Sequence, residues 1–401
     1  FIPAVMVSTV DQLLSADFHT GLWNHKDYAL LGSSVIFDEI HAYDSYTIAL
    51  ITSTIKKIKR YGGKVMLMSA TMPNFLKVHF LKILELKEPI IAYELLYRAN
   101  NEWIYLDMSL EDIRENVMKE LSTGKKVAII VNDIETAKSE YIYYSNKDIE
   151  TLCLHSEFTM LDRQRKENEL TSKEGNPYQL VISTQVIEVS LDVSFDVMFS
   201  ECAPIDSLVQ RAGRCNRYGL INDSKFYAFN PSEISIKWVY GKQKDIIIKT
   251  IEVLKKNKGK LTERQIMSMV EEVYEGFNLY DDDYKLGLDI VREIDQKKDF
   301  FDVNIFNEDE KLVTRKIEVM KVPIIPADNY KDIVEEHFEN GEYKMISLYE
   351  VPISISKFKK YVRKLEIGNR YNLPFFSVDY NSDYGINYNV ESDSNGTIYM
   401  F

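Results

Sequence analysis

The stretch Ser33-Ser34-Val35-Ile36-Phe37-Asp38-Glu39 joins a short apolar run to two acids. An apolar run of this length predicts a buried strand. Residues 46–61 then carry apolar side chains at helical spacing and end at Gly62-Gly63, and residues 64–71 predict a second strand, closed by Pro73. Strands that alternate with helices indicate a parallel α/β sheet, in which ligands normally bind at the carboxyl ends of the strands.

The same alternation continues on both sides of this stretch. Upstream, residues 5–9 predict another short buried strand. Downstream, from about residue 96 to 230, the sequence predicts strands over 125–131, 152–156, 179–184 and 197–199, a helix that starts at Asp133 and a helix over 159–170. The chain is therefore expected to hold two α/β units in tandem.

Beyond residue 230 the pattern changes. Helices are expected over 242–256 and 262–274, and Thr262 with Gln265 fits a capping box at the start of the second. Past Asp281 the sequence is rich in Tyr, Asn and Asp and predicts mixed strands and turns. The aromatic residues of this region, such as Phe375 and Tyr380, indicate a part that packs on the α/β units and offers rings for stacking, with ordinary core packing as the alternative.

The composition restricts the class of protein. Of 401 residues, 45% are hydrophobic and 28% charged, which excludes a disordered, collagen-like or disulfide-stapled chain. No apolar run approaches the roughly 18 residues of a membrane-spanning helix, so no membrane partner is expected. Three widely spaced cysteines and no visible secretory signal predict a cytoplasmic location. The net charge of −13 argues against a general nucleic-acid coat but allows a local groove that grips the nucleic-acid backbone.

The first group of residues that indicates chemistry is Asp38-Glu39-Ile40-His41, directly after a predicted strand. A carboxylate at a strand end can hold hydrated Mg²⁺ beside nucleotide phosphates, and a second can deprotonate a water. The alternative is a helix start with favourable acids. Ser69-Ala70-Thr71, at the end of the next strand, can link the acids to a neighbouring domain, or can be an ordinary helix cap before Pro73.

The second group is Gln210-Arg211-Ala212-Gly213-Arg214-Cys215-Asn216-Arg217. Guanidinium groups stabilise charge that develops on a transferring phosphoryl group. The alternative is a basic, solvated helix start. The absence of neighbouring carboxylates, in a chain that is acidic overall, argues against this alternative.

In this order, the three groups resemble the Walker B, coupling and final motifs of superfamily 2 helicases. Further segments resemble the CRISPR-associated helicase–nuclease of type I interference systems: Ser8 to Leu14, Asp38 to Asp44, Leu154 to Thr159 with Asp162-Arg163, Thr184 to Asp192, and Ala203 to Asp206. The resemblance covers residues 1 to about 220 and implies tandem RecA-like lobes, a motor that hydrolyses ATP with Mg²⁺, and 3′-to-5′ movement along single-stranded DNA. It also implies partnership with the CRISPR RNA-guided surveillance complex.

The resemblance implies a role for each matching residue. Asp38 would hold Mg²⁺ and Glu39 would be the base for the attacking water. Ser69, Thr71 and His41 would couple the acids to the second lobe. The residues expected at the nucleotide are Gln210, Arg211, Arg214, Arg217 and Asp192, the last near the ribose. The residues expected at the DNA backbone are Thr9, His155, Ser156 and Thr184.

Two departures from the family pattern stand out. No Gly-x-x-x-x-Gly-Lys-[Ser/Thr] loop, which would supply backbone amides to the phosphates, occurs in the 401 residues. No histidine is followed by Asp, so the metal ligands of the family's nuclease domain are not found. With Phe1 entering mid-pattern, these departures predict a fragment that is inactive alone and needs an N-terminal nuclease and phosphate-loop part as partner.

The predicted architecture is α/β with four parts. They are the C-terminal half of a first RecA-like lobe (1–95), a second RecA-like lobe (96–230), a helical linker (231–280) and a C-terminal accessory α+β domain (281–401). Two other functions stay open: another superfamily 2 DNA or RNA helicase, and a non-catalytic module that binds DNA or the effector complex.

Overall fold

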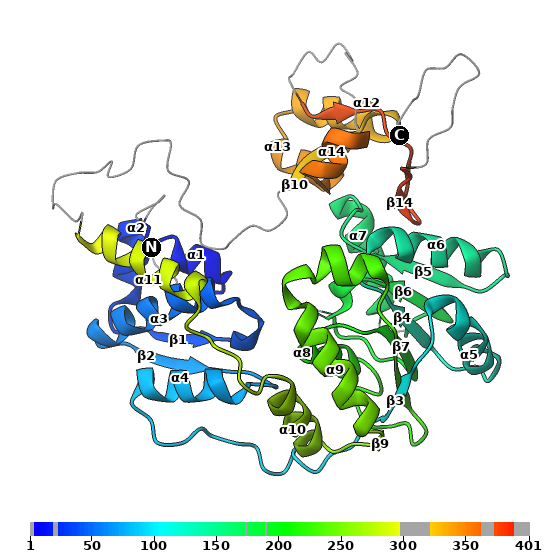
Figure 1. Cartoon of the computed structure of the whole chain (residues 1–401). Coiled ribbons are helices and arrows are strands. Elements are labelled where there is room, and N and C mark those ends of the chain that lie inside the picture. Colours follow the sequence, from blue (N-terminus) through cyan, green and yellow to red (C-terminus); the bar gives the residue numbers. More distant parts are fainter. Residues whose placement is uncertain are drawn as a thin grey trace. The chain divides into compact units, whose positions relative to one another are not determined.

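The computed structural model describes residues 4–18, 23–172, 175–188, 191–296, 321–361 and 373–388. The chain forms two compact units, each with its own core (Figure 1). The first unit combines Phe1–Tyr93 with Val270–Glu318, and the second combines Glu94–Met269 with Val319–Phe401. Both contain parallel strands and helices, as the sequence predicts. No helix within the described ranges is long and apolar enough to cross a membrane.

The first unit is built around two parallel strands, β1 (Ser34–Phe37) and β2 (Lys64–Leu67), which pair in register from Ser34↔Lys64 to Phe37↔Leu67. The helix between them, α3 (Ser45–Arg60), begins at Asp44, whose carboxylate accepts a hydrogen bond from the Thr47 N–H at 2.7 Å. Its apolar side, including Ile48, Ile51 and Ile55, is fully buried. The other helices of this unit are α1 (Val10–Leu14), α2 (Trp23–Leu30), α4 (Asn74–Leu84) and α11 (Asp282–Gln296).

One side of the β1–β2 sheet is open. Alternate side chains of a strand point to opposite faces, so Phe37 is buried while Ile36 and Met66 are 61% and 52% exposed. Apolar side chains of this sheet are therefore exposed at the surface of the described part of the first unit. The strand expected over residues 5–9 is wrong: these residues form no strand and are exposed. A five-residue segment without a partner strand has no ladder of hydrogen bonds to stabilise it.

Helix α11 packs along α3 although more than two hundred residues separate them (Figure 1, yellow beside blue). The contact is close at Gly287, where an added Cβ would lie 2.8 Å from the Tyr46 carbonyl oxygen and 2.9 Å from the Ala49 Cβ. The Ser45 hydroxyl also donates to Asp281 at 2.8 Å, just before α11 begins. Only a glycine fits at this crossing without moving a backbone.

Gly287→Val is expected to destabilise the first unit by about 1–3 kcal/mol, because the side chain overfills the contact between α11 and α3. The measurement is thermal unfolding. Gly241→Ala is the matched control, because a Cβ at that position meets nothing within 4 Å. Equal melting temperatures for the two variants would contradict the packing described above.

The second unit contains a seven-stranded sheet in the order β5-β6-β4-β7-β8-β3-β9, parallel except for β9. Its central strands are buried throughout and consist mainly of apolar residues, as expected of a parallel sheet covered on both faces. The strands are β3 (Glu102–Leu106), β4 (Val127–Ile130), β5 (Thr151–Leu154), β6 (Leu180–Ser183), β7 (Val197–Glu201), β8 (Lys225–Phe229) and β9 (Gly259–Lys260). The helices are α5 (Leu110–Ser122), α6 (Ile134–Ser145), α7 (Met160–Leu170), α8 (Ile205–Ala212) and α9 (Lys244–Lys256), and α10 (Glu263–Val273) follows.

The described C-terminal segments share the apolar core of the second unit and contact α6, α7 and the loop after β5, so they do not hang free. Ile324, Val351, Tyr380 and Ile386 belong to the same apolar core as the central strands. Phe375 and Tyr380 are buried, so core packing accounts for them. These segments contain strands β10 (Lys321–Pro326), β11 (Val351–Ser354) and β12 (Phe375–Phe376) and helices α12 (Ala327–Glu339), α13 (Tyr343–Ile346) and α14 (Ile355–Tyr361). They end in the C-terminal hairpin, residues 380–386, formed by β13 (Tyr380–Asn381) and β14 (Gly385–Ile386).

Candidate functional site

Two exposed acids follow β1 at the carboxyl end of the strand. Asp38 accepts a hydrogen bond from the Glu39 N–H at 3.0 Å, and both side chains face solvent. Glu39 adopts the left-handed conformation, with φ of 50°. That conformation is uncommon for a residue with a side chain and is often found at functional sites. The turn thus presents two carboxylates close together at the edge where α/β sheets bind ligands.

The pairing of β1 with β2 brings the acid turn against the predicted coupling residues. The Met68 N–H donates to the Phe37 carbonyl at 2.8 Å, which sets Ser69 beside His41. The His41 Nδ1 lies 2.7 Å from the Ser69 hydroxyl and 3.4 Å from Glu39 Oε2. Because the His41 side chain is only 1% exposed, this link is protected from water.

Thr71 extends this network and leaves one group unsatisfied. Its N–H donates to the Ser69 hydroxyl at 3.2 Å. Its own hydroxyl is buried and has no hydrogen-bond partner among the described residues. A buried hydroxyl without a partner costs about 1–3 kcal/mol, so a group outside these residues is expected to satisfy it.

The arginine-rich segment forms the end of α8 and the turn after it. Arg211 is fully buried, and all five of its N–H donors are engaged. The acceptors are Glu188 Oε1 at 2.7 Å, and the Ser200 hydroxyl, the Glu201 carbonyl, Asn132 Oδ1 and the Tyr240 hydroxyl at 3.0–3.4 Å. Burial opposes the charge of Arg211, but Glu188 outweighs it and the pKa is raised. The expected contact of Arg211 with a nucleotide does not fit this geometry, because no donor remains.

The other members of the segment are more accessible. Arg214 is half-buried, and its Nη2 donates to the Glu188 carbonyl at 2.8 Å. Arg217 is exposed and pairs with Asp192 at 2.9 Å. Gln210 is half-buried on α8. Asp192, expected near a ribose, is 69% exposed and also accepts from the Tyr218 hydroxyl at 2.9 Å. These guanidinium groups and Asp192 remain candidates for nucleotide contact.

The four residues expected at the DNA backbone differ in exposure. Thr9, in the first unit, is exposed. In the second unit Ser156 is half-buried, whereas His155 and Thr184 are 0% and 3% exposed. A direct phosphate contact does not fit the buried positions of His155 and Thr184, so of the three residues in the second unit only Ser156 presents its side chain to solvent.

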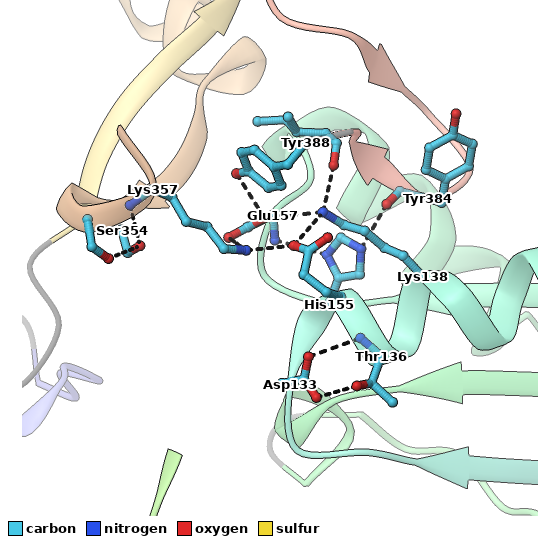
Figure 2. A network of polar contacts seen from close by, with 12 residues as sticks. Asp133, Thr136, Lys138, His155, Glu157, Ser354, Lys357, Tyr384 and Tyr388 are labelled. Atoms are coloured by element: carbon cyan, nitrogen blue, oxygen red, sulfur yellow. Dashed lines mark hydrogen bonds and ion pairs between the residues drawn. The ribbon is translucent and has the colours of Figure 1, made fainter. Parts of the chain in front are cut away.

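His155 is covered by the C-terminal hairpin (Figure 2). The Glu157 N–H donates to His155 Nδ1 at 3.1 Å, so His155 Nε2 carries the hydrogen that is donated to the Tyr384 carbonyl at 3.0 Å. Burial first, and then the Lys138 ammonium, hold the pKa of His155 well below its usual range. The imidazole also stacks on Phe158 at 4.3 Å. His155 therefore stays neutral and fixes the loop after β5 beneath the hairpin.

Four charged side chains beside His155 form a closed ionic ring. Lys138 Nζ lies 3.1 Å from Glu135 and 3.4 Å from Glu157, and Lys357 Nζ lies 2.7 Å from Glu135 and 2.8 Å from Glu157. Tyr388 packs against this ring: its hydroxyl donates to Glu157 at 3.1 Å, and both ammonium groups lie over its aromatic face (Figure 2). Lys138 also donates to the Ile386 carbonyl at 2.6 Å. The ring joins α6, the loop after β5 and α14 to the C-terminal hairpin.

Several of these residues carry no recognisable sequence signal. Glu188 lies inside a segment that the sequence singles out, so its pairing with Arg211 could have been suspected. Asn132, Tyr240 and the members of the ionic ring could not, because their partners are distant in sequence. Across the part of the chain that the structure describes, no group of three or more His, Cys, Asp or Glu side chains could hold a metal ion. Asp38 and Glu39 still suit Mg²⁺, which commonly takes one or two carboxylates together with waters and substrate phosphates.

Known proteins resemble this chain over most of its length. The family model described as CRISPR-associated nuclease/helicase Cas3, C-terminal, matches residues 123–219. A Methanocaldococcus jannaschii protein provisionally named CRISPR-associated nuclease/helicase Cas3 is 31% identical over 374 residues, 86% of this chain and 49% of that protein. The Streptococcus thermophilus CRISPR-associated nuclease/helicase Cas3 is 30% identical over 55% of this chain and 28% of its own length. The chain thus spans about half of the first relative and less of the second.

Solved structures share the fold. The crystal structure of T. fusca Cas3 with AMPPNP has a TM-score of 0.70 and 17% identity, over 97% of this chain and 54% of that one. A chain of a CRISPR RNA-guided surveillance complex described as pre-nicking has a TM-score of 0.63 and 17% identity, over 97% and 57%. The predicted α/β fold with RecA-like parallel-sheet lobes is confirmed.

Proposed function

We propose that this chain, a homologue of the CRISPR-associated nuclease/helicases named Cas3, supplies part of an ATP-driven motor that moves 3′ to 5′ along single-stranded DNA in type I CRISPR interference. The observation that supports the proposal most is the 2.7 Å contact between His41 and Ser69. It joins the acid turn to the hydroxyl turn, so that a change at one can reach the other.

The acids take the chemical roles in this proposal. Asp38 holds hydrated Mg²⁺, and Glu39 removes a proton from the attacking water. Bound ATP with Mg²⁺ supplies the phosphoryl group that is transferred to water. Both carboxylates are exposed, as an external ligand requires. Thr71, with its unsatisfied buried hydroxyl, and Ser69 would change hydrogen-bond partners as the motor works.

The second unit contributes positive charge and the contact with DNA. Arg214 and Arg217, supported by Gln210, stabilise negative charge on the phosphates. Asp192 orients the ribose, and Arg211 holds Glu188 and the ends of the neighbouring strands in place. Thr9 in the first unit and Ser156 in the second meet the DNA backbone. Contacts of that kind carry no sequence information, which suits movement along any sequence.

The proposed partners are single-stranded DNA, the RNA-guided surveillance complex, and a further N-terminal part that carries a phosphate-binding loop and a nuclease. The proposed domain boundaries stay at residues 95, 230 and 280. In the structure, helix α11 packs with the first unit, and the described segments 321–361 and 373–388 pack with the second.

The 401-residue chain tested alone is expected to release phosphate from ATP negligibly, with or without single-stranded DNA. None of its residues forms a Gly-x-x-x-x-Gly-Lys-[Ser/Thr] loop, and Asp38 and Glu39 repel an anionic nucleotide when no cation offsets them. The natural gene product that contains these residues is expected to show DNA-stimulated ATP hydrolysis. The measurement is phosphate release with and without a single-stranded oligonucleotide.

Two results would overturn parts of this proposal. Robust turnover by the 401-residue chain alone would contradict the nucleotide-site assignment. DNA binding without any hydrolysis by the natural gene product would instead favour a non-catalytic binding module, and stimulation by RNA in place of DNA would favour another kind of superfamily 2 motor.

A further inference from the structure

A cation from the C-terminal segments lies against the loop after β5. Lys321, the first residue of β10, places its ammonium 3.3 Å from the Ser156 hydroxyl oxygen and donates a hydrogen bond to it. Lys321 is 165 residues from Ser156 in the sequence, so no local pattern predicts the contact. Of the three side chains in this unit expected at DNA, Ser156 is the one that reaches the surface, and it has a positive charge beside it.

Both groups have donors to spare. The Ser156 hydroxyl accepts from Lys321, and its own hydrogen has no acceptor within the described residues. An ammonium has three donors, and Lys321 uses one on Ser156. Lys321 also makes no ion pair with a carboxylate of the described ranges. A hydroxyl and an ammonium side by side, both partly open to solvent, match the oxygens of a phosphate group.

The neighbouring acid does not oppose a phosphate at this position. Glu157 follows Ser156 directly, but its side chain is 4% exposed and lies between Lys138 and Lys357 in the ionic ring (Figure 2). Burial opposes the charge of Lys357, yet Glu157 and Glu135 outweigh it and raise the pKa of Lys357. The ring contains two acids and two bases, so it carries no net charge toward Ser156.

The loop that carries Ser156 is held by the C-terminal hairpin through the residues before and after Ser156. His155 is hydrogen-bonded to the hairpin at Tyr384, and a Cβ on Gly385 would lie 2.6 Å from the Glu157 carbonyl and 2.8 Å from His155 Cε1. The hairpin therefore approaches the loop as closely as a glycine permits. The Ser156 hydroxyl therefore lies on a fixed loop and can meet a phosphate with little loss of conformational entropy in that loop.

We propose that Ser156 and Lys321 together bind one backbone phosphate of single-stranded DNA, with the ammonium supplying charge and the hydroxyl a second donor. This inference rests on the proposed function and adds a DNA-contacting residue from the C-terminal segments. His155 is a positioning residue for the pair, and it holds the loop without touching the strand.

The test is the affinity of a fluorescent oligo-dT strand for the natural gene product, measured across a range of salt concentrations. Lys321→Gln is expected to reduce the salt slope by about 0.7, the value for one phosphate contact on single-stranded DNA. If the variant and the unaltered protein bind equally at 1 M salt, this slope makes the variant bind roughly fivefold more weakly than the unaltered protein at 0.1 M salt. Lys344→Gln is the matched control. Lys344 is an exposed lysine on α13 that has the same charge and no contact with Ser156.

Ser156→Ala and the double variant, Ser156→Ala with Lys321→Gln, complete a double-mutant cycle. If the two groups hold one phosphate, the double variant is expected to bind about as tightly as the weaker of the two single variants. The reason is that either substitution alone already removes the shared contact. Equal salt slopes for Lys321→Gln, Lys344→Gln and the unaltered protein would overturn the pair while leaving the proposed function in place. Failure of the unaltered protein to bind oligo-dT would overturn the proposed function and the pair with it.

Discussion

Glu39→Gln, introduced into the natural gene product that contains these residues, is expected to lower DNA-stimulated ATP turnover by about 10²–10⁴-fold, the contribution of a general base. The amide keeps the size and hydrogen-bonding reach of the carboxylate but cannot accept a proton from water. Glu39 is exposed and adopts a left-handed backbone conformation, so the substitution fills no core and the fold is expected to persist. ATP binding, measured with a fluorescent analogue, is expected to change little.

The control for this experiment is Glu85→Gln. Glu85 is a second glutamate of the first unit with a positive φ, of 60°, and its exposed carboxylate pairs with Lys59 at 3.1 Å. It therefore reports the effect of removing a carboxylate from a left-handed turn with no role in hydrolysis. Near-normal turnover by Glu39→Gln, or an equal loss in Glu85→Gln, would show that the base has been assigned wrongly.

Arg214→Ala is expected to have an effect of similar or larger size, a loss of up to about 10³–10⁵-fold in turnover if Arg214 acts as an arginine finger. Arg214 also donates to the Glu188 carbonyl, so truncation could disturb the turn after α8. Arg214→Lys separates the two effects because it keeps the positive charge and loses the planar fork. It is expected to fold normally and to remain strongly impaired.

Arg163→Ala serves as the control for charge. Arg163, on α7 in the same unit, is 42% exposed and pairs with Glu167 at 2.7 Å. An exposed pair of this kind contributes little to stability, so its loss is expected to leave turnover unchanged. If Arg214→Lys hydrolyses ATP at the normal rate, the guanidinium has no special part in the reaction.

The sequence predicts most of the local structure where each element carries its own signal. Helices α6 and α7 begin after Asp133 and Thr159, whose side chains accept hydrogen bonds from the N–H groups of Thr136 and Asp162, as expected of capping residues. Helix α10 begins with the predicted capping box at Thr262. The acid turn and Ser69-Ala70-Thr71 also meet as parallel strands require. In each case the information lies within a few residues of chain.

The predictions that do not fit the structure concern side chains that are buried by residues distant in the sequence. His155 has the type and position of a DNA contact, but the hairpin that covers it begins 225 residues later, at Tyr380. Arg211 matches an arginine motif, yet Glu188, Asn132 and Tyr240 surround its guanidinium. Residue type and spacing identify a chemical capability, and they do not tell which side chain of a motif faces inward.

The packing of α11 on α3 bears on how the protein is made. The ribosome completes α3 at residue 60, but its partner α11 ends only at residue 296, after the whole seven-stranded sheet has been synthesised. At about 5–20 residues per second, that interval is roughly 10–50 seconds. During this time the apolar side of α3 lacks part of its cover, while most of the second unit's sheet can already fold. We therefore expect the seven-stranded sheet of the second unit to form first on the ribosome, and the first unit to be the part that needs chaperone protection while α11 is still missing.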